Sequence, residues 1–201
     1  MRVLALDTAS PFPALALAEM SGAAADRVVL RPLPPAAAES IAAELRGLLD
    51  EAGLGLAALV RISVLSGPGS FTGLRAGLAF GRGLARALGI PLVPVRTFRA
   101  AAAALPEPPD ADFLLDAGRG EVFRARRRRG AVTEDSLPVP SVRARREADL
   151  DGVPVVDLSS SRAPLAAAAA RLAAVGSPGD DAAPVYGRRS AAEEKLERRL
   201  P

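Results

Sequence analysis

Cysteine and histidine, two residue types that carry much of enzyme chemistry, are absent from this sequence of 201 residues. Their absence excludes disulfides, thiol chemistry, zinc sites of the usual ligand sets and every catalytic triad that uses imidazole as its base. Catalysis would have to rest on acidic residues, hydroxyls, arginine, Tyr186 or the lone lysine, Lys195. The composition therefore narrows the enzyme classes open to this chain.

Long hydrophobic runs are also lacking, and we expect no secretory leader. No segment approaches the ~18 uncharged apolar residues of a membrane-spanning helix, and the first residues show no basic region followed by an apolar one. Hydrophobic residues still make up 49% of the chain, enough for one or two small domains. We expect a globular cytoplasmic protein that does not contact a membrane. Its net charge of +3 permits contact with nucleic acid without indicating it.

The first half of the chain shows three strand patterns followed by alternating helix and strand patterns. The predicted elements are strands at Arg2–Leu6, Ala14–Ala18 and Arg27–Leu33, a helix at Ala36–Ala52, a strand at Leu59–Leu65, a helix at Phe71–Leu88, a strand at Pro91–Val95 and a helix at Thr97–Leu105. This order predicts a mixed sheet, in which an antiparallel meander is joined to parallel crossovers.

The opening pattern returns after a proline-rich linker at Pro106–Asp110. A strand at Phe113–Asp116 ends in aspartate and leads through a turn into a second strand at Glu121–Arg126, as the first strand leads through Asp7 into the second. This repetition suggests an internal duplication. Beyond it, ordered elements are predicted only at Val153–Val156, Pro164–Val175 and Val185–Tyr186, with a short charged helix at Ala191–Leu200. We expect lobes at 1–105 and 106–190 and a tail at 191–201.

The predicted helix at Phe71–Leu88 contains unusually many glycines. Each interior glycine costs roughly 0.5 to 1 kcal/mol relative to alanine. A narrow polar ridge is formed by Arg75, Arg82 and Arg86, while the apolar residues cover about 220°, twice the arc that packing on one sheet requires. Gly73, Gly77 and Gly81 recur at intervals of four, so another backbone can approach closely. Either a partner protein or a second helix of the same chain would fill this groove.

The loop before this helix has two interpretations. Its residues are Ser66, Gly67, Pro68, Gly69 and Ser70. A loop between a strand and a helix can bind phosphate, but this one lacks the Gly-Lys-Ser/Thr ending of a P-loop. The alternative is a rigid structural turn, in which Ser70 or Thr72 caps the helix.

Two aspartates and a basic run are the remaining candidates for chemistry. Asp7 and Asp116 each follow a strand and could together hold a magnesium–nucleotide complex across a cleft, or Asp7 could simply cap its own turn. The run Arg126–Arg129 could contact phosphates, but with only Phe123 nearby to stack on a base, a solvated hairpin edge is favoured.

Five segments together resemble the TsaB family, namely ALDTAS, SGPGSFTGLRAGLAFGRGLA, IPLVPV, LLDAGRGEVF and PVYGRR. The resemblance implies a duplicated α/β fold of the actin-like, ribonuclease H-like superfamily, which also includes sugar kinases and glycoprotease-like proteins. A mixed five-stranded sheet is expected in the first lobe, and the second lobe is expected to be reduced. One departure lies at Tyr186–Arg188, where family members often read Tyr-Leu-Arg.

The resemblance also implies a function, which is that of a non-catalytic subunit. Proteins of this family dimerise with a TsaD-type enzyme and support transfer of a threonylcarbamoyl group to adenosine beside the anticodon of certain tRNAs. A TsaE-type ATPase is the third component. The TsaD-type subunit carries a histidine-ligated metal and the nucleotide, so no cofactor or metal is expected here, and tRNA is served indirectly.

The expected partner interface lies on the two helices of the first lobe. Its predicted residues are Gly73, Leu74, Gly77, Leu78, Phe80, Gly81, Leu84, Ile41 and Leu45. A homodimer through the same helices is expected when the enzyme subunit is absent, and Gly77→Leu is expected to abolish pairing without unfolding the monomer. The alternatives are an ATP-dependent phosphotransferase or nucleotide-binding protein that uses Asp7 and Asp116, and a peptidase, for which no catalytic dyad is evident.

Overall fold

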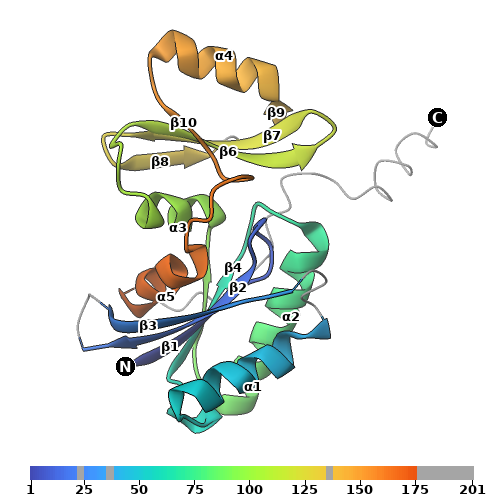
Figure 1. Ribbon diagram of the computed structural model, residues 1–201, viewed down its shortest axis with the longest axis vertical. Coiled ribbons are helices and arrows are strands. Elements are labelled where there is room, and N and C mark those ends of the chain that lie inside the picture. The colour runs from blue at the N-terminus through green and yellow to red at the C-terminus, as the bar shows by residue number, and fades with distance from the viewer. Residues whose placement is uncertain (22–24, 35–38, 135–137, 176–201) are drawn as a thin grey trace, which may run out of the picture.

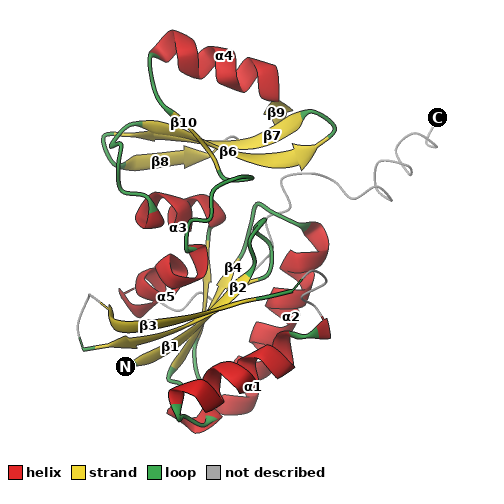
Figure 2. Cartoon of the chain, in the orientation of Figure 1, coloured by secondary structure: helices red, strands yellow, loops and turns green. Residues whose placement is uncertain are grey.

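Two five-stranded sheets and five α-helices form the part of the chain described by the computed structural model, which comprises residues 1–21, 25–34, 39–134 and 138–175 (Figures 1 and 2). The elements predicted at Val185–Tyr186 and Ala191–Leu200, and the departure at Tyr186–Arg188, lie outside these residues. Within them, every helix is too short or too polar to cross a bilayer.

The first sheet has the mixed topology predicted from the sequence. Its strands are β1 (Arg2–Asp7), β2 (Ala14–Met20), β3 (Ala25–Pro32), β4 (Arg61–Leu65) and β5 (Leu92–Val95). They lie in the order β3-β2-β1-β4-β5, with β1 antiparallel to β2, β2 antiparallel to β3, and β1, β4 and β5 mutually parallel. The central strands are buried on both faces, as the continuous apolar sequence of β1 requires.

Helices α1 (Ile41–Ala52) and α2 (Phe71–Leu88) cover one face of this sheet (Figure 1). A short 3₁₀ helix, Leu56–Ala58, follows α1. Each α-helix ends at a glycine with positive φ, Gly53 at 66° and Gly89 at 65°, as expected for C-terminal caps. The core under the helices is rich in large aliphatic side chains, among them Leu4, Leu6, Leu15, Leu17, Ile62 and Leu48.

The opposite face of the first sheet packs on α3 (Thr97–Ala104) and α5 (Leu165–Val175), which lie between the two sheets (Figure 1). Because side chains alternate along a strand, this face carries small residues such as Ala5, Ala16 and Ala18. The alanines of α5 therefore approach the sheet closely, and the Ser63 hydroxyl donates to the Ala169 carbonyl at 3.2 Å. The expected boundaries placed 165–175 in the second lobe, but α5 packs on the first sheet.

The second sheet contains the predicted hairpin of β6 (Ala111–Gly118) and β7 (Glu121–Arg128). The shorter strands are β8 (Ala131–Glu134), β9 (Val139–Pro140) and β10 (Val155–Asp157), and α4 (Ser141–Asp151) covers the outer face (Figure 1). The sequence did not predict β8, β9 or α4. Helix α4 buries only Ala144 and Ala148, too few apolar positions to give a helical pattern.

Candidate functional site

Asp7, the last residue of β1, is buried and held entirely by its own turn. One carboxylate oxygen accepts hydrogen bonds from the backbone N–H of Ala9 at 3.2 Å and of Ser10 at 2.9 Å, and the other accepts from the Ser10 hydroxyl at 2.6 Å. Burial raises the pKa of Asp7 to about 6, although the hydrogen bonds from Ser10 and Ala9 oppose the shift. Of the two interpretations of Asp7, the structure supports the turn cap.

Asp116 occupies the corresponding place in the second hairpin but is exposed. Its carboxylate accepts from the Gly118 N–H at 2.8 Å, and its own N–H donates to the Ser159 hydroxyl at 2.9 Å. The described residues contain no group of three or more acidic side chains placed to hold a metal ion. Each aspartate therefore serves its local turn, and no contact joins Asp7 to Asp116 among the described interactions.

The loop Ser66–Ser70 is tied to the first lobe by backbone hydrogen bonds. Ser66 N–H donates to the Val95 carbonyl, Ser70 N–H donates to the Ala9 carbonyl, and the Gly67 carbonyl accepts from Thr97 N–H, each at 2.9 Å. Ser70 is the N-cap residue of α2, and its hydroxyl accepts from Gly73 N–H at 3.3 Å. These bonds are what the rigid-turn interpretation requires, because they occupy groups that a phosphate would need.

Gly73, Gly77 and Gly81, which we call the inner stripe, face the chain's own first strand and the turn after it. A Cβ atom on Gly73 would overlap the Thr8 carbonyl oxygen, and one on Gly77 would overlap the Thr8 hydroxyl. On Gly81 it would lie 3.1 Å from Leu6 Cδ1. The Thr8 hydroxyl also donates to the Gly73 carbonyl at 2.6 Å. The prediction that a partner or a second helix fills this groove is wrong, because the end of β1 already fills it.

Four other predicted interface residues also face the core of the monomer. Leu74, Leu78, Ile41 and Leu45 are all buried in the monomer. Most of their surface is therefore unavailable to a partner unless the core opens. A side chain at Gly77 would collide with Thr8 inside the monomer, so Gly77→Leu is now expected to damage the fold itself and not only the pairing.

A different surface of the same two helices is open. Phe80 and Leu84 on α2 are half-buried and, with α1 and the segment after it, line a groove of 340 Å³. Beside them, the exposed residues Ala79, Gly83 and Ala87 recur at intervals of four, and we call them the outer stripe. A Cβ atom on Gly83 would meet nothing within 4 Å. The outer stripe is thus the side of α2 that another backbone can approach.

The arginine ridge borders this surface. Arg75, Arg82 and Arg86 are exposed, and the Arg75 guanidinium lies 4.1 Å from the centre of the Phe71 ring. Helix α2 contains no acidic residue. The exposed face of α2 therefore carries small residues along its centre and arginines along its edge.

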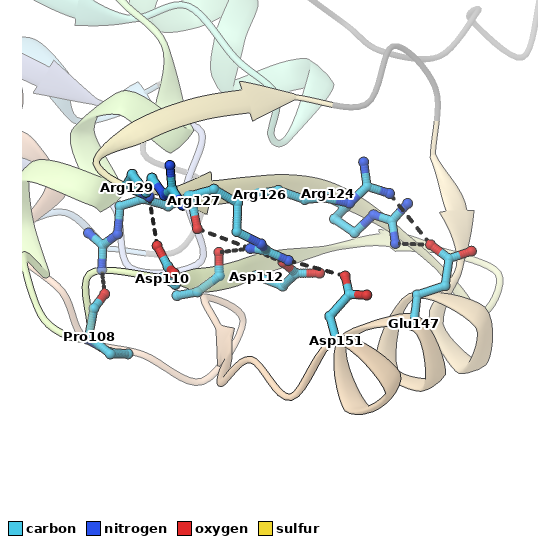
Figure 3. Close-up of polar contacts among 11 residues, drawn as sticks. Pro108, Asp110, Asp112, Arg124, Arg126, Arg127, Arg129, Glu147 and Asp151 are labelled. Atoms are coloured by element: carbon cyan, nitrogen blue, oxygen red, sulfur yellow. Dashed lines mark hydrogen bonds and ion pairs between the residues drawn. The ribbon is translucent and has the colours of Figure 1, made fainter.

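The basic run of β7 does not form the solvated hairpin edge expected from the sequence. Arg124 pairs with Glu147 of α4 at 2.5 Å (Figure 3). Arg128 pairs with Asp112 of β6 at 2.8 Å and with Asp151 of α4 at 3.4 Å. Arg124 is only 2% exposed. The hydrogen bond from Arg124 is the main cause that lowers the pKa of Glu147. This face of β7 is neutralised by carboxylates and offers few free charges to a phosphate backbone.

Arg127 points the opposite way and is 3% exposed. Its guanidinium donates to the carbonyls of Ala102 at 3.0 Å and Leu105 at 2.6 Å, and also to the Pro108 carbonyl (Figure 3). It lies 5.0 Å from the centre of the Phe113 ring. Arg127 therefore fastens the end of α3 and the predicted linker to the second sheet.

Comparisons with known proteins give the family of the chain and bear on its fold. The sequence profile of the family described as TsaD, tRNA N6-adenosine threonylcarbamoyltransferase, matches residues 35–158. The chain belongs to this family. No curated protein gives a significant match. Membership in this tRNA-modification family agrees with the function class implied by the sequence resemblance.

Two solved structures place the chain more closely. YeaZ from Pseudomonas aeruginosa is 27% identical, with a TM-score of 0.55 over 69% of this chain and 68% of that one. A protein described as similar to peptidase YeaZ from the same organism is 24% identical, with a TM-score of 0.68 over 93% of this chain and 99% of that one. YeaZ is the TsaB protein, so the chain is TsaB-like and has the expected actin-like α/β fold.

Proposed function

We propose that this chain is a non-catalytic subunit that pairs with a TsaD-type threonylcarbamoyltransferase. The single observation that carries the proposal is the open face of α1 and α2, in a TsaB-like member of the family. Catalysis in this chain would also have to do without histidine, the residue that ligates the metal of the TsaD-type enzyme. The proposal assigns that metal and the nucleotide to the partner subunit.

The proposed interface combines the outer stripe with the groove beside it. Small residues at intervals of four allow a partner helix to approach α2 closely, and the Phe80 and Leu84 side chains offer it half-exposed apolar surface. Anchors of this kind, set in a pocket and surrounded by polar residues, carry most of the binding energy in protein interfaces. The interface keeps the helices predicted from the sequence but moves the contact to their opposite edge.

Substitutions that enlarge the outer stripe test this interface. Ala79→Leu and Gly83→Leu add side chains where the monomer is open, so the fold should survive while binding of the TsaD-type subunit from the same genome weakens at least tenfold. Ala103→Leu, at an exposed alanine of α3, is the matched control. Calorimetry with the two purified subunits measures the affinities. Wild-type affinity in both α2 variants would refute the interface.

Two further parts of the proposal concern assembly. A homodimer through the same face would form when the enzyme subunit is absent, and a TsaE-type ATPase would join the complex, all in the cytoplasm. Light scattering behind a sizing column would show the dimer, and Gly83→Leu should shift it to monomer. Micromolar binding of Mg-ATP by the isolated chain, lost in Asp7→Ala, would instead favour a nucleotide-binding protein.

A further inference from the structure

A hollow lies at the turn between β1 and β2, away from the proposed partner interface. Its volume is 650 Å³, within the range of about 300–1,000 Å³ that small-molecule sites occupy. The walls are mostly apolar and include Pro11, Phe12, Pro13, Pro32, Pro34 and Pro164. None of its lining residues also lines the groove between α1 and α2.

The walls of this pocket are held in place before any ligand arrives. Five of the lining residues are prolines, whose φ angles are fixed by their rings. Leu33 N–H donates to the Pro13 carbonyl at 2.9 Å, joining the segment after β3 to the turn between β1 and β2. The hydroxyls of Thr8 and Ser10 are committed to Gly73 and Asp7. A preformed pocket spares the ligand the entropic cost of ordering its site.

Among the described residues that line the pocket, Arg162 is the one charged side chain and none carries a carboxylate. The Arg162 guanidinium lies 5.2 Å from the centre of the Phe12 ring. Among the described residues Arg162 takes part in no ion pair. Ser70 and Thr72 add hydroxyl groups to the lining. The pocket thus combines an apolar interior, lined by proline and phenylalanine rings, with one cation that has no carboxylate partner among the described residues.

We infer that this pocket binds a small organic anion whose body is apolar and carries rings. The anionic group pairs with Arg162, because a planar guanidinium binds carboxylate, sulfonate or phosphate oxygens in a bidentate manner. The ring system lies against the prolines and Phe12. A cationic ligand is disfavoured by Arg162, and a strongly polar one would lose hydration against walls that offer few hydrogen bonds.

Two fluorescent probes with one ring system separate the two halves of this inference. Anilinonaphthalene sulfonate carries the anion, and phenylnaphthylamine has the same rings without the sulfonate. Titration of the full chain should show saturable binding of both at one site, with the sulfonate bound about five- to tenfold more tightly. Equal affinities, or no saturable binding of the sulfonate, would overturn the inference.

Three variants locate the binding. Arg162→Gln should weaken the sulfonate about five- to tenfold and leave phenylnaphthylamine unchanged, whereas Arg99→Gln, which removes an exposed arginine outside the pocket, should change neither. Thr72→Trp, at an exposed position of the lining, should weaken both probes. Sulfonate binding that survives Thr72→Trp, or that falls equally in both arginine variants, would place it elsewhere and overturn the inference.

Discussion

The two hairpins β1–β2 and β6–β7 share a pattern, in which a strand with an aspartate at or near its end turns into an antiparallel partner, yet different forces hold them. In the first, Leu4 lies opposite Leu17 and Ala5 opposite Ala16. In the second, Asp112 lies opposite Arg126 and Leu114 opposite Arg124. The first hairpin is stabilised by apolar burial and direct backbone contact, and the second by buried arginines with specific acceptors. The same topology can thus be built from two kinds of core.

Replacing Arg127 should destabilise the second hairpin more than any other substitution proposed here. Arg127→Ala removes a buried cation that donates to three main-chain carbonyls and leaves a cavity, so the free energy of unfolding should fall by about 3–5 kcal/mol. Urea denaturation measures the loss. Arg143→Ala, which removes a surface pair with Glu147, should cost less than about 1 kcal/mol. Similar losses in the two variants would show that Arg127 does not hold α3 and the linker on the second sheet.

The first hairpin should instead lose stability when a residue of the inner stripe is enlarged. Gly73→Ala places a methyl group against the Thr8 carbonyl, part of the backbone that cannot swing away. We expect a loss of about 2–4 kcal/mol in unfolding free energy, because the helix must move from the sheet or bend. Thermal unfolding followed by circular dichroism would record it. An unchanged melting temperature would contradict the packing of Thr8 on α2.

The two hairpins should also respond to pH in opposite directions. The pKa of Asp7 is raised to about 6 from 3.8, so its contribution to stability is fully present below pH 4 and is lost as the pH rises through about 6. The pKa of Glu147 is lowered by Arg124, so its contribution is present above its ordinary pKa and is lost as the pH falls.

Asp7→Asn isolates the first of these effects. The amide keeps an oxygen to accept from Ala9 and Ser10 and cannot ionise, so the variant should match the wild type near pH 4 and exceed its stability by about 2–3 kcal/mol at pH 8. Denaturation at several pH values gives the profile, with Asp116→Asn as the control for removing one carboxylate. Parallel curves for Asp7→Asn and the wild type would contradict the role of burial.

The smallest expected change in stability comes from a comparison of two glycines of α2, Gly83 and Gly73. Gly83→Ala adds a methyl group where nothing lies within 4 Å, so it should raise the unfolding free energy by about 0.5–1 kcal/mol through helix propensity alone. The same substitution at Gly73 should do the reverse. A loss of stability in Gly83→Ala would mean that the outer stripe is already covered in the monomer.

The sequence was sufficient for the first sheet and both hairpins, because apolar runs separated by Pro and Gly carry the strand order directly. It failed where the cause lies far along the chain. The spacing of Gly73, Gly77 and Gly81 predicts a close backbone contact correctly, but the contact is Thr8, 65 positions away from Gly73. The only local sign was the small residues after Asp7.

Charge misled the interpretation of the second lobe for a related reason. A run of arginines indicates a solvated edge unless acceptors are known, and those of Arg127 are main-chain carbonyls, which leave no trace in a sequence. Helix α4 was missed because its buried surface is limited to two alanines. Most of the predicted interface residues face inward in the monomer, because no pattern in one helix tells its inward face from its outward one when both carry glycine or alanine.

The return of α5 to the first sheet has a consequence for how the chain is made. Within residues 1–105, α3 packs on one face of the sheet, but the cover of that face is completed only when Leu165–Val175 has been made. A ribosome adding about 5–20 residues per second leaves that alanine-lined face partly uncovered for several seconds. During that interval the residues of the second sheet are synthesised. The helix that completes the first lobe is therefore made after the second sheet.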